Sequence, residues 1–209
     1  MAYPFARNLF VPVLQFFIRS AKGVENVPEH GPCILACKHT GPLDGVFMAA
    51  VIVPKIKQKI HFITNPARCG WLWEKIVVQR WAGAIPYNKK DPARCLDLAQ
   101  DYLRKGKFVG IFPGGLLQNP EATQRRGKTG VARLALWTRA PVLPIGLHNF
   151  KVLKRGKMII THLRNPHNMR ITIGKPMTFS DAYNKPITYG LLREITARIV
   201  DRIEQLSAM

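Results

Sequence analysis

The chain has 209 residues, of which 47% are hydrophobic, so it is long enough for one domain with a buried core. It carries 32 Lys and Arg against 12 Asp and Glu, a formal charge of +20, which favours a polyanionic partner. An anionic bilayer, a nucleic acid, coenzyme A and an acidic carrier protein all meet that description. The absence of Ser-rich, Gly-rich or repetitive stretches excludes a linker-joined array.

The first segment of interest is N-terminal. In Pro4 to Ile18, apolar residues such as Phe5, Leu9 and Val13 recur at helical spacing. Fifteen helical residues reach about 22 Å, short of a hydrocarbon core of about 30 Å, so this segment is expected to lie in a membrane interface. A helix packed on the domain's own core is the alternative, and the two are compatible if each face does one job.

We therefore divide the chain into residues 1–20, an amphipathic membrane-associating segment, and residues 21–209, the main domain. The N-terminal segment does not resemble a signal peptide, because its apolar run is interrupted and no small-residue cleavage site follows. We expect a cytoplasmic protein that binds peripherally to the inner face of the membrane, with its anionic surface as one partner.

The rest of the chain alternates short apolar runs with amphipathic runs. Strands are predicted at Cys33–Cys37, Ile60–Thr64, Ala84–Tyr87, Phe108–Phe112, Val142–Leu147, Met158–His162 and Met169–Ile173. Helices are predicted at Leu43–Val53, Trp71–Arg80, Pro92–Lys105, Lys128–Arg139 and Tyr189–Leu206. This alternation predicts an α/β fold with a mainly parallel sheet flanked by helices. Ligands of such sheets gather at the carboxyl ends of the strands.

One titratable pair lies at such a strand end. His39 follows the strand Cys33–Cys37, and Asp44 lies in the first turn of the next helix, at or near its third position. A carboxylate that accepts a proton from one imidazole nitrogen leaves the other nitrogen free to take a proton from a substrate hydroxyl. The alternative is structural, because a carboxylate at a helix N-terminus is stabilising whether or not a histidine is nearby.

Four further segments follow in an order that matters. The HxxxxD pattern of His39 and Asp44 resembles the first motif of the glycerolipid acyltransferase family, which includes the 1-acylglycerol-3-phosphate acyltransferases. The other segments resemble the family's second, third and fourth blocks and the stretch between the last two: Gly83–Lys89, Phe112–Leu117, Ala140–Gly146 and Gly127–Ala135.

The resemblance implies a glycerol-phosphate-acyltransferase-like fold and an acyl transfer. His39, held by Asp44, would remove the proton of a lysolipid hydroxyl, and the acceptor would be lysophosphatidic acid or a related lysolipid. The acyl donor would be acyl-coenzyme A or an acyl carrier protein, and no cofactor is expected because a thioester is already activated. The implied substrate-binding residues are Lys89, Gly114, Gly115, Arg125, Arg126 and Lys128.

The chain also departs from the family pattern. In the third block Gly114 replaces Glu, and Leu116 and Leu117 replace Thr and Arg, so a carboxylate and a cation are both missing. Lys38 stands where Asn is usual, and Lys89 where Arg is usual. A lipid-binding relative that has lost its activity is therefore an open alternative.

Other site classes have little support. Basic residues are spread along the whole chain without a nucleic-acid-binding module, so a nucleic acid is not the expected partner. Cys33, Cys37, Cys69 and Cys95 form no CxxC and no zinc-ligand spacing, so we expect reduced, mostly buried thiols and no metal site.

Overall fold

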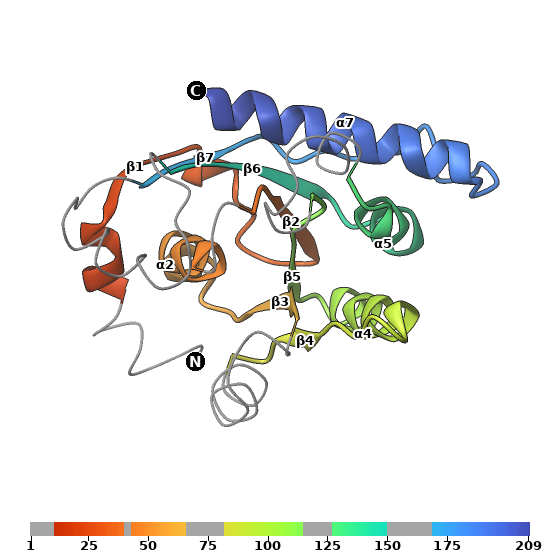
Figure 1. Cartoon of the computed structure of the whole chain (residues 1–209), viewed down its shortest axis with the longest axis horizontal. Coiled ribbons are helices and arrows are strands. Elements are labelled where there is room, and N and C mark those ends of the chain that lie inside the picture. Colours follow the sequence, from red (N-terminus) through yellow and green to blue (C-terminus); the bar gives the residue numbers. More distant parts are fainter. Residues whose placement is uncertain (1–10, 40–42, 66–81, 115–126, 150–168) are drawn as a thin grey trace.

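The computed structural model describes residues 11–39, 43–65, 82–114, 127–149 and 169–209. They form one seven-stranded sheet of order β1-β7-β6-β2-β5-β3-β4 with helices on both faces (Figure 1). The predicted α/β class with a mainly parallel sheet is confirmed. Every strand pair is parallel except β6 with β7.

The strands agree closely with the predicted ones. They are β1 (Ile18–Lys22), β2 (Cys33–Cys37), β3 (Ile60–Thr64), β4 (Ile85–Pro86), β5 (Phe108–Ile111), β6 (Val142–Asn149) and β7 (Met169–Ile173). All five residues of β2 are buried, as expected for a central strand with helices on both faces. The predicted strand Met158–His162 and helix Trp71–Arg80 lie outside the described residues.

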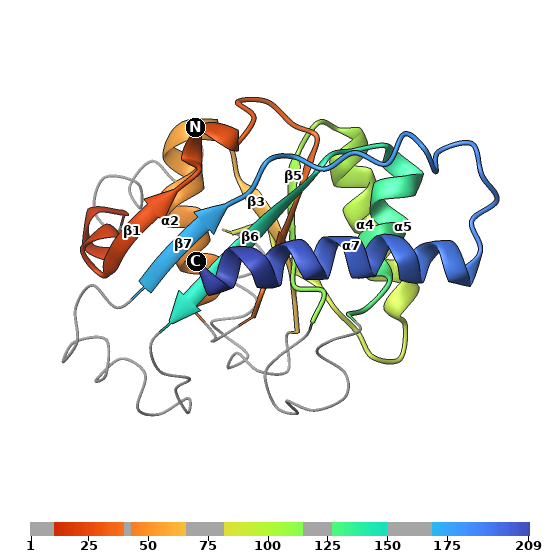
Figure 2. The same ribbon diagram turned by 90° about the horizontal axis from the view of Figure 1, so that it is seen from above.

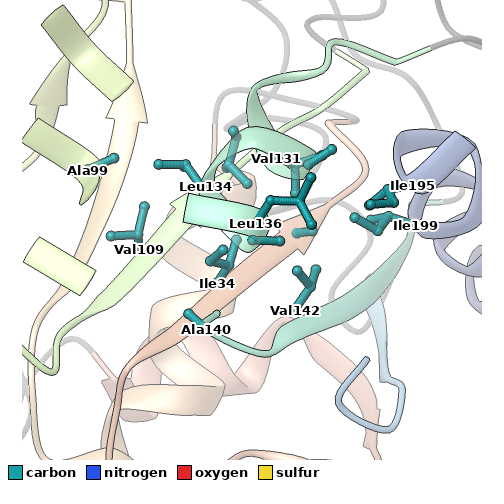
Figure 3. Packing of buried hydrophobic residues seen from close by; sticks show 14 of the residues in the cluster. Ile34, Ala99, Val109, Val131, Leu134, Leu136, Ala140, Val142, Ile195 and Ile199 are labelled. Atoms are coloured by element: carbon teal, nitrogen blue, oxygen red, sulfur yellow. The ribbon is translucent and has the colours of Figure 1, made fainter. Parts of the chain in front are cut away.

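Three helices cover one face of the sheet: α4 (Pro92–Arg104), α5 (Gly130–Thr138) and α7 (Tyr189–Ala208). Their apolar sides form one core cluster with the inward residues of the strands. Figure 3 shows Val142 of the sheet near Ile199 of α7, with Leu136 of α5 between Ile34 and the α7 residues. Figure 2 shows α7 lying over β6, where a Cβ on Gly146 would come within 2.4 Å of the Leu206 backbone. A glycine is therefore required for this close approach.

The opposite face is covered by α2 (Asp44–Ile56). Lys55 of α2 donates to the Val24 carbonyl of the short 3-10 turn η1 (Val24–Asn26) at 3.1 Å. A second core cluster joins α2 to the other side of β2, β5, β6 and β7. Because β2 contributes Ile34 to one cluster and Leu35 to the other, its alternating side chains hold the two layers together.

Strand β1 was not predicted. It is an edge strand parallel to β7, and three of its five residues are exposed, so its sequence Ile-Arg-Ser-Ala-Lys has no run of apolar residues to reveal it. The division at residue 20 falls inside β1, so Ile18 and its neighbours belong to the sheet rather than to the N-terminal helix.

Residues 11–16, which precede β1, are helical. Leu14 and Phe17 pack against the α2-side core, and Gln15 Nε2 donates to the Ala50 carbonyl of α2 at 3.2 Å. Val13 and Phe16 are 55% and 57% exposed. This segment therefore has one packed side and one exposed apolar side. Within the described ranges, none of the helices has the length and apolar character needed to span a bilayer.

Candidate active site

The first block lies where β2 ends and α2 begins. His39 Nδ1 lies 2.8 Å from Asp44 Oδ2, a hydrogen bond between a side chain that is 17% exposed and one that is 2% exposed. Asp44 is the first residue of α2 and Leu43 is the N-cap, so the carboxylate lies earlier in the helix than the predicted third position. The Asp44 carboxylate is thus buried, whereas the His39 imidazole is partly exposed.

The start of α2 is a favourable place for a carboxylate. The position of Asp44 in the first turn of α2 places it near the free N–H groups and the positive end of the helix dipole. Burial raises the pKa of the neighbouring Cys37 thiol well above its usual range, and the charge of Asp44 raises it further. The carboxylate therefore accepts a proton from Nδ1, and this tautomer places the imidazole's acceptor lone pair on Nε2.

The third block contributes an aromatic ring. Phe112 directly follows β5, and its ring stacks on the His39 ring at 4.5 Å between centroids and 30° between planes. Phe62 of β3 stacks on Phe112 in turn, with 6.2 Å between the two ring centroids. A Cβ on Gly110 would meet Phe62 at 2.2 Å, so glycine in β5 makes room for this row of rings. The parallel pairing of β2 with β5 brings the two blocks together, as the sequence predicts.

The second block follows β4. The Tyr87 N–H donates to the Thr64 carbonyl at 2.7 Å, which extends the β3 and β4 ladder by one residue. Lys89 is exposed in the bend between β4 and α4. Asp91 then caps α4 by accepting from the Arg94 N–H at 3.2 Å. The block thus holds Lys89 on a short, well-defined connection.

His61 supports this block from β3, through contacts with residues too distant in the sequence for a local pattern to indicate. Its Nδ1 lies 2.8 Å from the Gly83 carbonyl, and its ring stacks on Tyr102 of α4 at 3.8 Å. Burial lowers the pKa of His61, an effect that the Gly83 hydrogen bond opposes and that Lys59 and Lys107 reinforce. A neutral His61 that donates from Nδ1 fits these contacts.

Lys128 connects the second and third blocks. Its Nζ lies 5.4 Å from the centre of the Tyr87 ring, a cation–π contact, and its backbone N–H donates to the Pro113 carbonyl at 2.7 Å. Of the other predicted substrate-binding residues, Gly114 lies three residues after β5, and a Cβ built on it would have no described residue within 4 Å. Gly115, Arg125 and Arg126 lie outside the described residues.

Lys38, next to His39, forms an ion pair that the sequence did not predict. Its Nζ lies 2.6 Å from Glu204 Oε2 on α7. The two residues are 166 positions apart, so no local pattern could have linked them.

Cys33, Cys37 and Cys95 are free and buried, as predicted for the three cysteines that the structure describes. Burial raises the pKa of Cys33 to about 12. In the described part of the chain no three His, Cys, Asp or Glu residues are grouped so that they could hold a metal ion.

The chain matches the model of a protein family described as Acyltransferase over residues 18–148, which is more than half of its length. It is 23% identical over 194 residues to the 1-acyl-sn-glycerol-3-phosphate acyltransferase of Bacillus subtilis, covering 87% of this chain and 84% of that protein.

An uncharacterized protein of Mycobacterium tuberculosis is 24% identical over 149 residues, covering 65% of this chain and 40% of that protein. Among solved structures, the 1-acyl-sn-glycerophosphate (LPA) acyltransferase PlsC from Thermotoga maritima superposes with a TM-score of 0.59 at 18% identity. That alignment covers 98% of this chain and 82% of the PlsC chain, and it shows a shared fold.

Proposed function

The chain belongs to the Acyltransferase family and is an acyltransferase, and from this premise we propose that it acylates a hydroxyl of lysophosphatidic acid or a related lysolipid. The observation that supports this best is the hydrogen bond between His39 and the buried Asp44, beside the Phe112 ring at the carboxyl ends of β2 and β5. The likeness to the Bacillus subtilis 1-acyl-sn-glycerol-3-phosphate acyltransferase supports the choice of acceptor.

The proposed reaction uses His39 as a general base. Asp44 accepts the Nδ1 proton, so Nε2 takes the proton from the acceptor hydroxyl as its oxygen attacks the thioester carbonyl carbon. A new carbon–oxygen bond forms, the carbon–sulfur bond breaks, and the leaving thiolate recovers the proton from the imidazolium. The products are an ester and a free thiol. The buried carboxylate stabilises the imidazolium while it exists.

The donor is an acyl thioester, either acyl-coenzyme A or an acyl-loaded carrier protein. Both carry phosphate groups or acidic residues, and the +20 charge of the chain favours their approach. The thioester is already activated, so His39 and Asp44 need no cofactor for the proposed step.

Lys89 and Lys128 are the proposed cations for the acceptor's anionic headgroup. Lys89 is exposed two residues after Tyr87, and Lys128 lies over the Tyr87 ring. A lysine meets phosphate as a point charge rather than as a planar fork, so each contributes attraction without fixing a unique orientation. Arg125 and Arg126 belong to the same proposal on the strength of the sequence alone.

The helical residues 11–16 are the proposed contact with an anionic membrane surface, on the inner face of the membrane. Val13 and Phe16 are exposed there, while the packed side of the segment attaches it to α2, the helix that begins with Asp44. Vesicle co-sedimentation tests this: Phe16→Glu is expected to reduce binding to anionic vesicles, and unchanged binding would contradict it.

The test of the activity is release of free thiol from acyl-coenzyme A and from acyl carrier protein with a panel of lysolipid acceptors. Acceptor-dependent release that His39→Ala lowers by at least about a thousandfold supports the proposal. If no combination of donor and acceptor releases thiol above the His39→Ala background, the lipid-binding relative is favoured instead. Salt-sensitive binding to duplex DNA without thiol release would favour a nucleic-acid-binding protein.

A further inference from the structure

Helix α7 lies outside residues 18–148, the part of the chain that matches the family model, yet it contacts the candidate site at two points. Arg193, Thr196, Val200 and Glu204 lie within about 80° on one side of α7, given about 100° of rotation per residue. We call these four residues the α7 contact face. Arg193, Thr196 and Val200 meet Gly127, and Glu204 pairs with Lys38 beside His39.

The contact at Gly127 holds a single peptide group from both sides. Arg193 Nη1 donates to the Gly127 carbonyl at 2.8 Å. The N–H of the same peptide, which belongs to Lys128, donates to the Pro113 carbonyl at 2.7 Å. A trans peptide directs its carbonyl and its N–H in opposite directions, so this group is clamped between α7 and the end of β5.

The packing at Gly127 is too close for any other residue. Its φ is +58°, and a Cβ would come within 2.8 Å of Val200 Cγ2 and 2.9 Å of Thr196 Cγ2. Both the left-handed backbone and the close contact with α7 require glycine. The peptide therefore has one orientation, and α5 starts directly after it, with Thr129 as its N-cap.

We propose that Arg193 is a positioning residue for Lys128 and for the third block. Its hydrogen bond fixes the Gly127–Lys128 peptide, which directs the Lys128 side chain over Tyr87. The same peptide binds the Pro113 carbonyl and so fixes the backbone directly after Phe112, the ring that stacks on His39. A charged donor on a backbone carbonyl forms a stronger hydrogen bond than a neutral one. The Glu204 pair with Lys38 is the second point of contact and steadies the end of β2.

This inference rests on the proposed function for its kinetic consequence, because Lys128 is the proposed headgroup cation. Arg193→Met is expected to raise the KM for the lysolipid acceptor about tenfold, with the KM for the thioester donor changed less than about twofold. Arg193→Lys retains a charged donor and is expected to restore most of the acceptor KM. A purely structural role would change both constants or neither.

The matched control is Arg198→Met. Arg198 is on the same helix and pairs with Asp181 at 3.4 Å, away from Gly127. The decisive measurement is amide hydrogen exchange at Lys128, followed through the Lys128 amide cross-peak in two-dimensional NMR spectra, together with melting temperatures that verify folding. We expect Arg193→Met to speed this exchange about tenfold and Arg198→Met to leave it at the wild-type rate.

The two outcomes separate this inference from the proposed function. Faster exchange at Lys128 in Arg193→Met alone supports the clamp even if the wild-type chain transfers no acyl group, whereas the absence of transfer counts only against the proposed function. An exchange rate that Arg193→Met changes no more than Arg198→Met does would overturn the positioning role. Gly127→Ala gives an independent check, since it must also speed exchange.

Discussion

The ends of the neighbouring strands β2 and β5 together form the candidate site, but one contributes polar side chains and the other mainly backbone and an aromatic ring. At the end of β2 the chemistry lies in side chains, the imidazole of His39 and the carboxylate of Asp44 from the following helix. At the end of β5, Phe112 contributes a ring, Pro113 a backbone carbonyl, and Gly114 no side chain at all.

The register of the sheet makes this difference direct. β2 and β5 pair in parallel from Cys33 with Phe108 to Ala36 with Ile111, and His39 and Gly114 each follow the last pair by three residues. Among the residues that the structure describes, none has an atom within 4 Å of a Cβ built on Gly114. The described part of the chain thus gives no packing reason for the glycine that replaces the family's third-block carboxylate. His39 and Asp44, the proposed proton-transfer pair, are both present, and the third block contributes the aromatic ring of Phe112.

If the end of β2 is the chemical half of the site, Asp44→Asn must have the largest effect after His39→Ala. The amide presents N–H to Nδ1 and so favours the tautomer with its proton on Nε2, which cannot accept the hydroxyl proton. We expect kcat to fall by about two to three orders of magnitude in the thiol-release assay. Asp181→Asn, which removes an exposed carboxylate paired with Arg198, is the control. A kcat for Asp44→Asn within about threefold of wild type would mean that Asp44 serves only the helix.

The parts of this site that the sequence predicts are those written in short stretches of chain. His39 and Asp44 are five residues apart, and the buried run Cys33–Cys37 before them identifies a central strand by itself. The same holds for the third block, because parallel strands bring their carboxyl ends to one edge of the sheet. Local pattern and topology together therefore predict both halves of the comparison.

Contacts between distant residues were not predictable in this way. His61 meets Gly83 across 22 positions, Arg193 meets Gly127 across 66, and Lys38 meets Glu204 across 166. Each pair joins residues of separate parts of the chain, where no helix or strand period can connect them, so only the fold reveals them. The edge strand β1 escaped prediction for a different reason, since an exposed edge needs few apolar residues.

The contribution of the β5 end can be isolated at Phe112. Its ring lies against the imidazole that carries a positive charge during the proposed reaction, and an aromatic face stabilises a cation. We expect Phe112→Leu to lower kcat about three- to tenfold through loss of this contact and of the fixed ring position. Phe112→Tyr keeps the ring and is expected to stay near the wild-type kcat. Equal losses in both variants would show that the site requires the shape of phenylalanine rather than an aromatic face.

The smallest effect is expected at Gly114, where a substitution tests directly whether the end of β5 acts without a side chain. Gly114→Ala adds a methyl group that contacts none of the described residues, so it is expected to leave kcat and the acceptor KM unchanged within about twofold. Gly114→Glu restores the family's carboxylate without its arginine, since Leu117 stands in that position. The added negative charge then repels an anionic headgroup, so the acceptor KM should rise about two- to fivefold while kcat stays constant. Steady-state kinetics at two ionic strengths check this, because added salt should reduce the difference. A lower acceptor KM for Gly114→Glu would mean that a carboxylate side chain at the end of β5 can still bind the acceptor. The two strand ends would then differ only because this chain lacks that side chain, and not because they have different roles.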